Sequence, residues 1–107
     1  MKVKEGIAWV NQRKNCKNPF DAMIELYKQE TLARVELRNH GKREVSVELM
    51  KGIVREMDDW IFKIAIAMKF DEVSARAVVR EAHDAADNAM KLAVAFHTTY
   101  KAGSSGA

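Results

Sequence analysis

The sequence predicts an all-α protein: a small antiparallel helical bundle with one short N-terminal helix and three longer helices at about residues 19–40, 46–69 and 72–101. Apolar residues recur at steps of three and four over these ranges, which is the spacing of one helix face. Helix-capping residues stand where each longer helix is expected to begin. The composition, 48% hydrophobic and 31% charged over 107 residues, is typical of one globular domain, so we expect residues 1–101 to form that domain and 102–107 a flexible tail.

The first two helices are predicted from spacing and from capping residues. A short first helix that ends near residue 15 is indicated by apolar residues at helical spacing: Val3, Ile7 and Val10. Asn18 followed by Pro19 is typical of an N-cap and the first helical residue. Gly41 can adopt the left-handed conformation that closes a helix, so the second helix is expected to end just before it.

The third and fourth helices are expected to begin at the N-cap residues Ser46 and Asp71. The third carries a core face at Met50, Ile53, Val54, Met57, Ile61, Ile64, Ala65 and Met68. The fourth carries a stripe of mostly small residues at Ala75, Val78, Ala82, Ala85, Ala89, Leu92 and Phe96. Small residues allow a neighbouring helix to approach closely, so this stripe is predicted to face the bundle.

The segment from Trp60 to Phe70 is apolar on all sides of the expected third helix. Two explanations remain open: the helix is the central one of its own chain, or one side of it pairs with another chain. The fourth helix is also long enough to extend beyond its neighbours, and either the first helix or a second subunit would cover that overhang. We therefore expect a partner interface at Trp60, Phe62, Ile66, Phe70, Phe96 and Tyr100.

Two groups of basic residues indicate an alternative, the binding of nucleic acid or of a nucleotide. One group lies in the N-terminal segment and the other around the end of the second helix. They comprise Lys2, Lys4, Arg13, Lys14 and Lys17, and Arg34, Arg38, Lys42 and Arg43. Clustered positive charge suits phosphate contacts, but the net charge of +3 is modest, and cations near the end of a helix also favour its dipole.

Neither catalysis nor metal binding is predicted from the residue pattern. The chain has no glycine-rich phosphate loop and no nucleophile with an evident base. His83 and Asp87 are four residues apart and could share an ion, but no glutamate is followed by a histidine three residues later, as di-iron bundles require. We therefore expect no enzyme activity, no metal and no cofactor.

Two arginine–histidine pairs have a spacing similar to that of helical nucleases of the HEPN type. Arg76 precedes His83 by six intervening residues, and Arg34 precedes His40 by five. The residue after each arginine is apolar, Ala77 or Val35, where that family has a polar residue. The spacing alone does not assign the chain to the family.

The expected function is therefore non-enzymatic. We expect an adaptor, inhibitor or assembly protein that self-associates and binds a macromolecular partner, with nucleic-acid or nucleotide binding as the alternative. The N-terminus lacks the apolar region of a signal peptide, and the single cysteine, Cys16, fits a reducing compartment, so a cytoplasmic location away from membranes is expected. The sequence identifies neither the partner nor the oligomeric state.

Overall fold

The computed structural model describes residues 1–13, 18–39 and 46–105, with side chains up to residue 92, and every regular element within these ranges is a helix. The four helices are α1 (Val3–Gln12), α2 (Pro19–Arg38), α3 (Val47–Ala67) and α4 (Glu72–Ser105). The predicted fold class, a small all-helical bundle, is confirmed. The expected closing residue Gly41 lies outside the described residues, and α4 continues beyond its expected end at residue 101.

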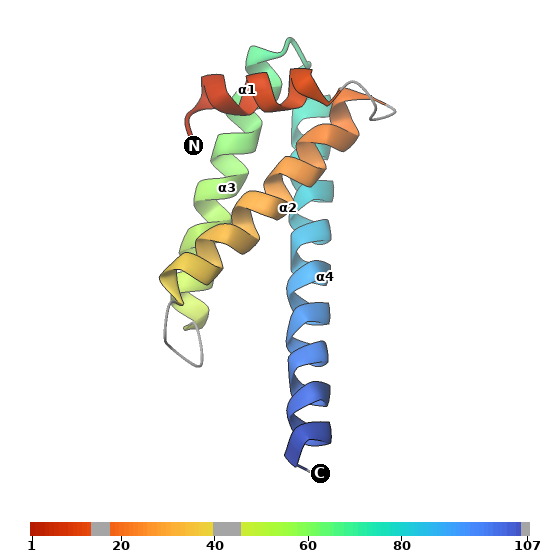
Figure 1. The fold of residues 1–107 in the computed structure, drawn as a ribbon. Coiled ribbons are helices and arrows are strands. Elements are labelled where there is room, and N and C mark those ends of the chain that lie inside the picture. Colours follow the sequence, from red (N-terminus) through yellow and green to blue (C-terminus); the bar gives the residue numbers. More distant parts are fainter. Residues whose placement is uncertain (14–17, 40–45, 106–107) are drawn as a thin grey trace.

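The helices form an antiparallel bundle that is closed at one end only. α2, α3 and α4 run alternately up and down, and α1 crosses α2 and α3 at the end that holds the α3–α4 turn (Figure 1). At the opposite end the C-terminal part of α4 projects beyond α2 and α3, and the molecule measures 53 × 29 × 22 Å. The overhang was expected from helix lengths, but the idea that α1 covers it is wrong, because α1 packs at the other end.

The three predicted N-caps are confirmed by hydrogen bonds. The Asn18 side-chain oxygen accepts from the Asp21 N–H at 2.9 Å, and the Ser46 hydroxyl accepts from the Leu49 N–H at 3.1 Å. The Asp71 carboxylate accepts from the Ser74 N–H at 2.7 Å and from its hydroxyl at 3.0 Å. The bond from the Ser74 backbone lowers the pKa of Asp71, because it stabilises the charged carboxylate.

The turn between α3 and α4 contains a residue in the left-handed conformation. Lys69 has a φ of 71°. Its N–H donates to the Ile66 carbonyl, and the Phe70 N–H donates to the Ala65 carbonyl, both at 3.0 Å. This pair of bonds is the Schellman motif, which usually places glycine where Lys69 stands. Phe70 then packs against the core, and Asp71 starts α4, so the reversal is tight.

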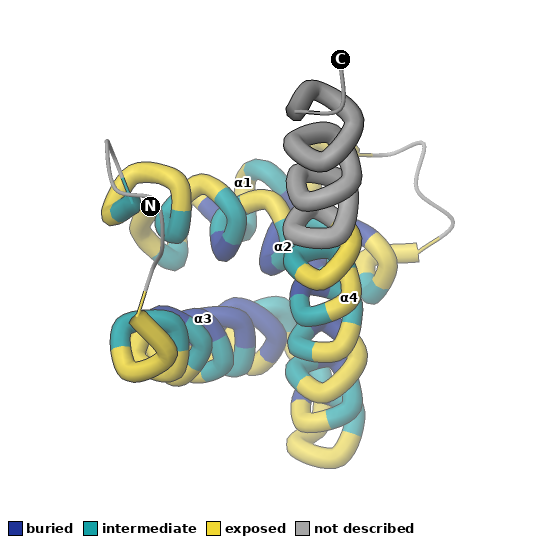
Figure 2. The backbone as a smooth tube through the Cα atoms, turned by 90° about the horizontal axis from the view of Figure 1, so that it is seen from below, coloured by how far each residue is buried: buried dark blue, intermediate teal, exposed yellow. Residues whose placement is uncertain are grey.

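The core is built from large side chains on α2 and α3 packed against small ones on α4. The fully buried residues of α2 and α3 include Met23, Leu26, Tyr27, Ile53, Met57, Ile61 and Ile64. α4 contributes Ala75, Val78, Ala82 and Ala86, all at 0–1% exposure. Figure 2 shows these buried positions facing one another between the three helices. The predicted core face of the third helix therefore meets the first part of the predicted stripe of the fourth, Ala75, Val78 and Ala82, whereas Ala86, which was not predicted, is buried and Leu92, which was, is exposed.

α1 approaches α3 closely at a glycine. A β-carbon added at Gly6 would collide with the Ile64 Cδ1 atom and would lie 3.1 Å from Trp60 Cζ2. Ile64 is fully buried and Trp60 nearly so, which leaves little room for either to move away. Part of the Trp60–Phe70 segment is thus covered by α1 of the same chain.

Two glycine substitutions should change stability in opposite directions. Gly52, in the middle of α3, has no atom within 4 Å of the position of an added β-carbon. Gly52→Ala should therefore raise the free energy of unfolding by about 0.5–1 kcal/mol, through helix propensity alone. Gly6→Ala gains the same propensity but should lower the free energy of unfolding, because it overpacks Ile64 and Trp60. Urea denaturation of both variants tests this, and an equal gain at the two sites would contradict the close α1–α3 contact.

Lys69→Gly should stabilise the protein. The left-handed conformation costs a non-glycine residue about 1–2 kcal/mol, which the greater freedom of glycine in the unfolded chain only partly offsets. We expect a net gain of about 0.5–1 kcal/mol in thermal or urea denaturation. Lys69→Ala is the control, because alanine keeps the β-carbon and removes only the charge. A similar gain for alanine would assign the effect to charge instead of backbone conformation.

Candidate functional site

The structure describes the side chains of four of the six residues predicted as a partner interface. Trp60 is only 8% exposed and packs on α1, while Phe62 and Phe70 are partly buried against the core. Ile66 remains 41% exposed. Phe96 and Tyr100 belong to the projecting part of α4, with side chains outside those described. The chain itself therefore covers most of the apolar segment of α3.

The two predicted basic groups lie at opposite ends of the bundle. Lys2, Lys4 and Arg13 are exposed on and beside α1, which lies at the end of the bundle where α2 begins (Figure 1), whereas Arg34 and Arg38 lie in the last turns of α2, roughly 22–28 Å along that helix. Both of these arginines bind Glu56 of α3, at 3.2 and 3.4 Å. The remaining members, Lys14, Lys17, Lys42 and Arg43, lie outside the described residues, as do Cys16 and His40. The described cations thus do not join into a single phosphate-binding surface.

A groove on the outer side of α3 and α4 brings together residues that the sequence analysis did not connect. It encloses about 580 Å³ and is lined by Asp58, Asp59 and Phe62 of α3 and by Arg76, Val79, Arg80, His83 and Asp84 of α4. The lining residues of α4 recur at steps of three and four, so they share one helix face. Asp58 and Asp59 line the α3 side, Phe62 and Val79 supply apolar surface, and the polar lining of the α4 side consists of Arg76, Arg80, His83 and Asp84.

Three helices meet at one carboxylate of this groove. The buried Tyr27 hydroxyl of α2 donates to Asp58 Oδ1 of α3 at 2.5 Å, and His83 Nδ1 of α4 lies 3.5 Å from the same oxygen. Burial of the Tyr27 ring, and then its bond to Asp58, raise the pKa of the phenol well above its usual value. The phenol is therefore a permanent donor at neutral pH, and it fixes the position of the Asp58 carboxylate.

Two of the remaining charged residues of the groove, Arg76 and Asp59, form ion pairs along their own helices. Arg76 binds Glu72 at 2.8 Å, and its guanidinium lies 5.5 Å from the centre of the Phe62 ring. Asp59 binds Lys63 at 2.8 Å. Both pairs are between exposed residues four apart on one helix, so water screens them and they contribute little stability. Neither Arg80 nor Asp84 forms an ion pair with another of the described residues.

The partner of His83 was not predicted from the sequence, because that partner lies on another helix. Spacing pairs it with Asp87, but Asp87 binds Lys91 at 3.0 Å, whereas His83 faces Asp58. In the sequence, Asp58 directly follows the core residue Met57 and precedes the core residue Ile61 by three positions. This spacing is the one signal that could have indicated a carboxylate near other helices. Nothing in a single sequence connects Tyr27, Asp58 and His83.

Within the described part of the chain, no three histidine, cysteine or acidic side chains converge as metal ligands would. None of the helices searched over the same residues is both long and apolar enough to cross a bilayer.

No protein-family model, curated protein or solved structure matches the chain. The function must therefore be inferred from the geometry of the chain itself.

Tyr27→Phe should destabilise the protein by about 1–2 kcal/mol at pH 7, because a partly buried carboxylate loses its donor. The difference should shrink above pH 10. Above pH 10 the unfolded wild-type chain loses the proton of Tyr27, whereas the folded chain keeps it because its pKa is raised. The free energy of unfolding of the wild type therefore falls as pH rises, by up to about 1.4 kcal/mol per pH unit. Urea denaturation of both proteins between pH 7 and 11 checks this. A constant difference over the whole range would contradict the assigned role of the phenol.

Proposed function

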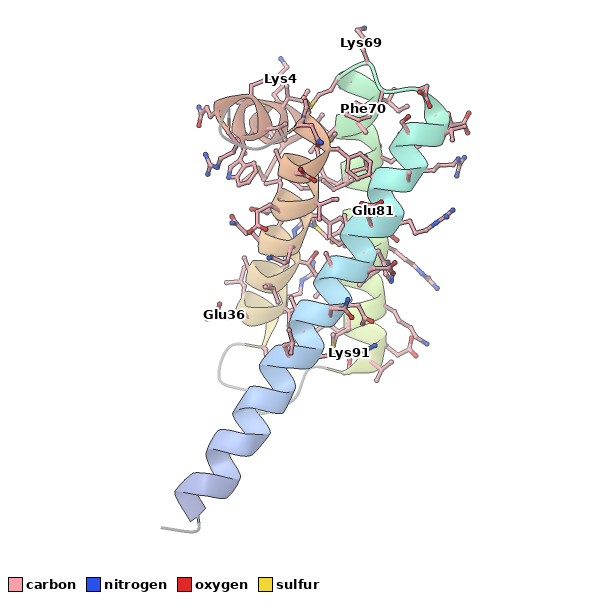
Figure 3. All side chains as sticks on the ribbon, turned by 90° about the vertical axis from the view of Figure 1, so that its right-hand side faces the viewer. Lys4, Glu36, Lys69, Phe70, Glu81 and Lys91 are labelled. Atoms are coloured by element: carbon pink, nitrogen blue, oxygen red, sulfur yellow. The ribbon has the colours of Figure 1, made fainter. Side chains whose placement is uncertain are left out.

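We propose that this protein is a non-enzymatic helical protein that self-associates and binds a macromolecular partner, as an adaptor, inhibitor or assembly protein. The observation that supports this is the change in burial along one stripe of α4. Ala75, Val78 and Ala82 of the predicted stripe are fully buried against α2 and α3, but Leu92 of the same stripe is 71% exposed. The stripe continues in the sequence through Phe96 and Tyr100, past the ends of the helices that cover it (Figure 3).

Other exposed apolar residues lie toward the same end of the bundle. Leu37, next to the end of α2, is 76% exposed, and Val47, at the start of α3, is 66% exposed. Figure 1 places both helix ends on the side from which α4 projects. The three other exposed large apolar residues among those described, Met1, Ile66 and Val73, lie toward the opposite end, so the contact surface is proposed for the α4 stripe and not for exposed apolar residues in general.

A second copy of the chain is the occupant that suits this surface best. Two projecting α4 segments can pair antiparallel about a two-fold axis, so that each stripe covers the equivalent stripe of the other copy. The stripe of the projecting part carries larger residues, Leu92, Phe96 and Tyr100, so the paired helix axes would lie near the upper end of the usual range of roughly 8–10 Å. A heterologous partner would use the same apolar face through its own amphipathic helix.

The nucleic-acid alternative draws less support from the structure. Glu56 already neutralises part of the charge of Arg34 and Arg38, and the exposed cations beside α1 lie at the far end of the bundle. We therefore keep protein association as the proposed function.

Leu92→Glu should weaken self-association at least about tenfold, because the introduced carboxylate would be buried in the interface without a partner. Val73→Glu is the matched control, since Val73 lies on the same helix at 80% exposure but away from the stripe. Light scattering behind a sizing column should give a salt-resistant dimer for the wild type and for Val73→Glu, and a 12.1 kDa monomer for Leu92→Glu. A monomeric wild type, or equal dissociation of the two variants, would overturn the proposal.

A further inference from the structure

We propose that the groove between α3 and α4 binds a small zwitterion with an apolar body, of the class of short peptides and free amino acids. The ammonium group would lie on the acidic side formed by Asp58 and Asp59, and the carboxylate on the basic side formed by Arg76 and Arg80. This site is separate from the projecting part of α4 and does not depend on self-association.

The charge layout of the groove selects a dipolar ligand. Its lining contains three carboxylates, of Asp58, Asp59 and Asp84, and the two guanidinium groups of Arg76 and Arg80. A phosphate dianion would be repelled by the carboxylates, and a polyamine would be repelled by the arginines. A molecule that carries one charge of each sign complements both sides, because each of its ends meets a group of opposite charge.

The charged side chains of the groove are available to a ligand. Arg80 has no ion pair among the described residues. The pairs of Arg76 with Glu72 and of Asp59 with Lys63 are solvent-exposed, so little is lost when they are exchanged for contacts with a ligand. Asp58 is held in place by Tyr27, and its carboxylate retains acceptor sites beyond the one that the phenol uses.

The size and the floor of the groove favour a short peptide over a single amino acid. A volume of about 580 Å³ is within the usual range for small-molecule sites, of about 300–1,000 Å³. Phe62 and Val79 are only partly buried, so both can contact an apolar ligand side chain. A dipeptide also separates its two charges farther than an amino acid does, which suits a groove in which Asp58 and Asp59 belong to α3 while Arg76 and Arg80 belong to α4.

The test uses leucylleucine and two derivatives that each lack one charge. N-acetylleucylleucine lacks the ammonium group, and leucylleucine amide lacks the carboxylate. Binding to the full chain is measured by ¹H–¹⁵N NMR titration, in which shift changes also report the location of the site. Leucylleucine should bind with a dissociation constant of about 0.1–1 mM, and each derivative should bind about tenfold more weakly or worse.

Two variants identify the protein partner of each ligand charge. Arg80→Gln should weaken leucylleucine about tenfold but should leave the affinity for the amide nearly unchanged, because the amide has no carboxylate to lose. Asp59→Asn should also weaken leucylleucine about tenfold. It should leave the affinity for N-acetylleucylleucine nearly unchanged, because that derivative has no ammonium group to lose. Both side chains are exposed, so neither change should unfold the chain. Arg55→Gln, an exposed change on α3 outside the groove lining, is the control and should leave all three affinities unchanged.

The proposal is overturned if leucylleucine, at ten times the upper end of the expected range of dissociation constants, causes no NMR shift changes at the groove residues. It is also overturned if the three ligands bind equally well. Equal weakening of all three ligands by Arg80→Gln would also overturn it, because the arginine would then act without contacting the carboxylate. Repeating the titration with Leu92→Glu separates this result from the proposed self-association. Groove binding should persist in that variant whatever its oligomeric state.

Discussion

The small side chains along the inner face of α4 are the constraint on which the rest of the bundle depends. Ala75, Ala82 and Ala86 are buried at 0–1% exposure, and α2 and α3 both pack on α4 there. Alanine contributes little apolar area itself, so the burial that stabilises the core comes from the larger side chains of α2 and α3 that reach over it. A larger residue on α4 would separate the helices or distort their rotamers, since protein interiors are already close-packed.

This packing also explains why an apolar segment of α3 needs no second chain along most of its length. α3 contacts α1, α2 and α4, so Trp60, Ile61, Ile64 and Ala65 are all buried although they point in different directions. α1 completes the enclosure because Gly6 allows its backbone to approach Ile64 and Trp60. The surplus apolar pattern lies instead on α4, whose stripe extends past the helices that cover it.

Polar side-chain contacts between the described helices occur at two carboxylates, Asp58 beside the groove and Glu56 between α2 and α3. Asp58 accepts a bond from the buried Tyr27 of α2 and lies beside His83 of α4, so one carboxylate connects three helices. Most other ion pairs join residues three or four apart on one helix and are exposed, and they specify the arrangement of the helices only weakly. The fixed carboxylate gives the outer side of α3 and α4 a preorganised acidic edge that faces the arginines of α4, which is the basis of the proposed zwitterion site.

The sequence by itself determined the helical class, the three N-caps and the faces that form the core. These features depend on residues close together in the chain: Asn18 with Asp21, Ser46 with Leu49, and Asp71 with Ser74. Tertiary structure decided the position of α1, the burial of Trp60 and the convergence of Tyr27 with Asp58. It also gave Arg34 and Arg38 a shared partner in Glu56, 18 or more residues away, which a count of basic residues does not reveal. The physical reason is that capping and periodicity act over three or four residues, whereas these contacts join separate helices whose relative position is set by packing of the whole core.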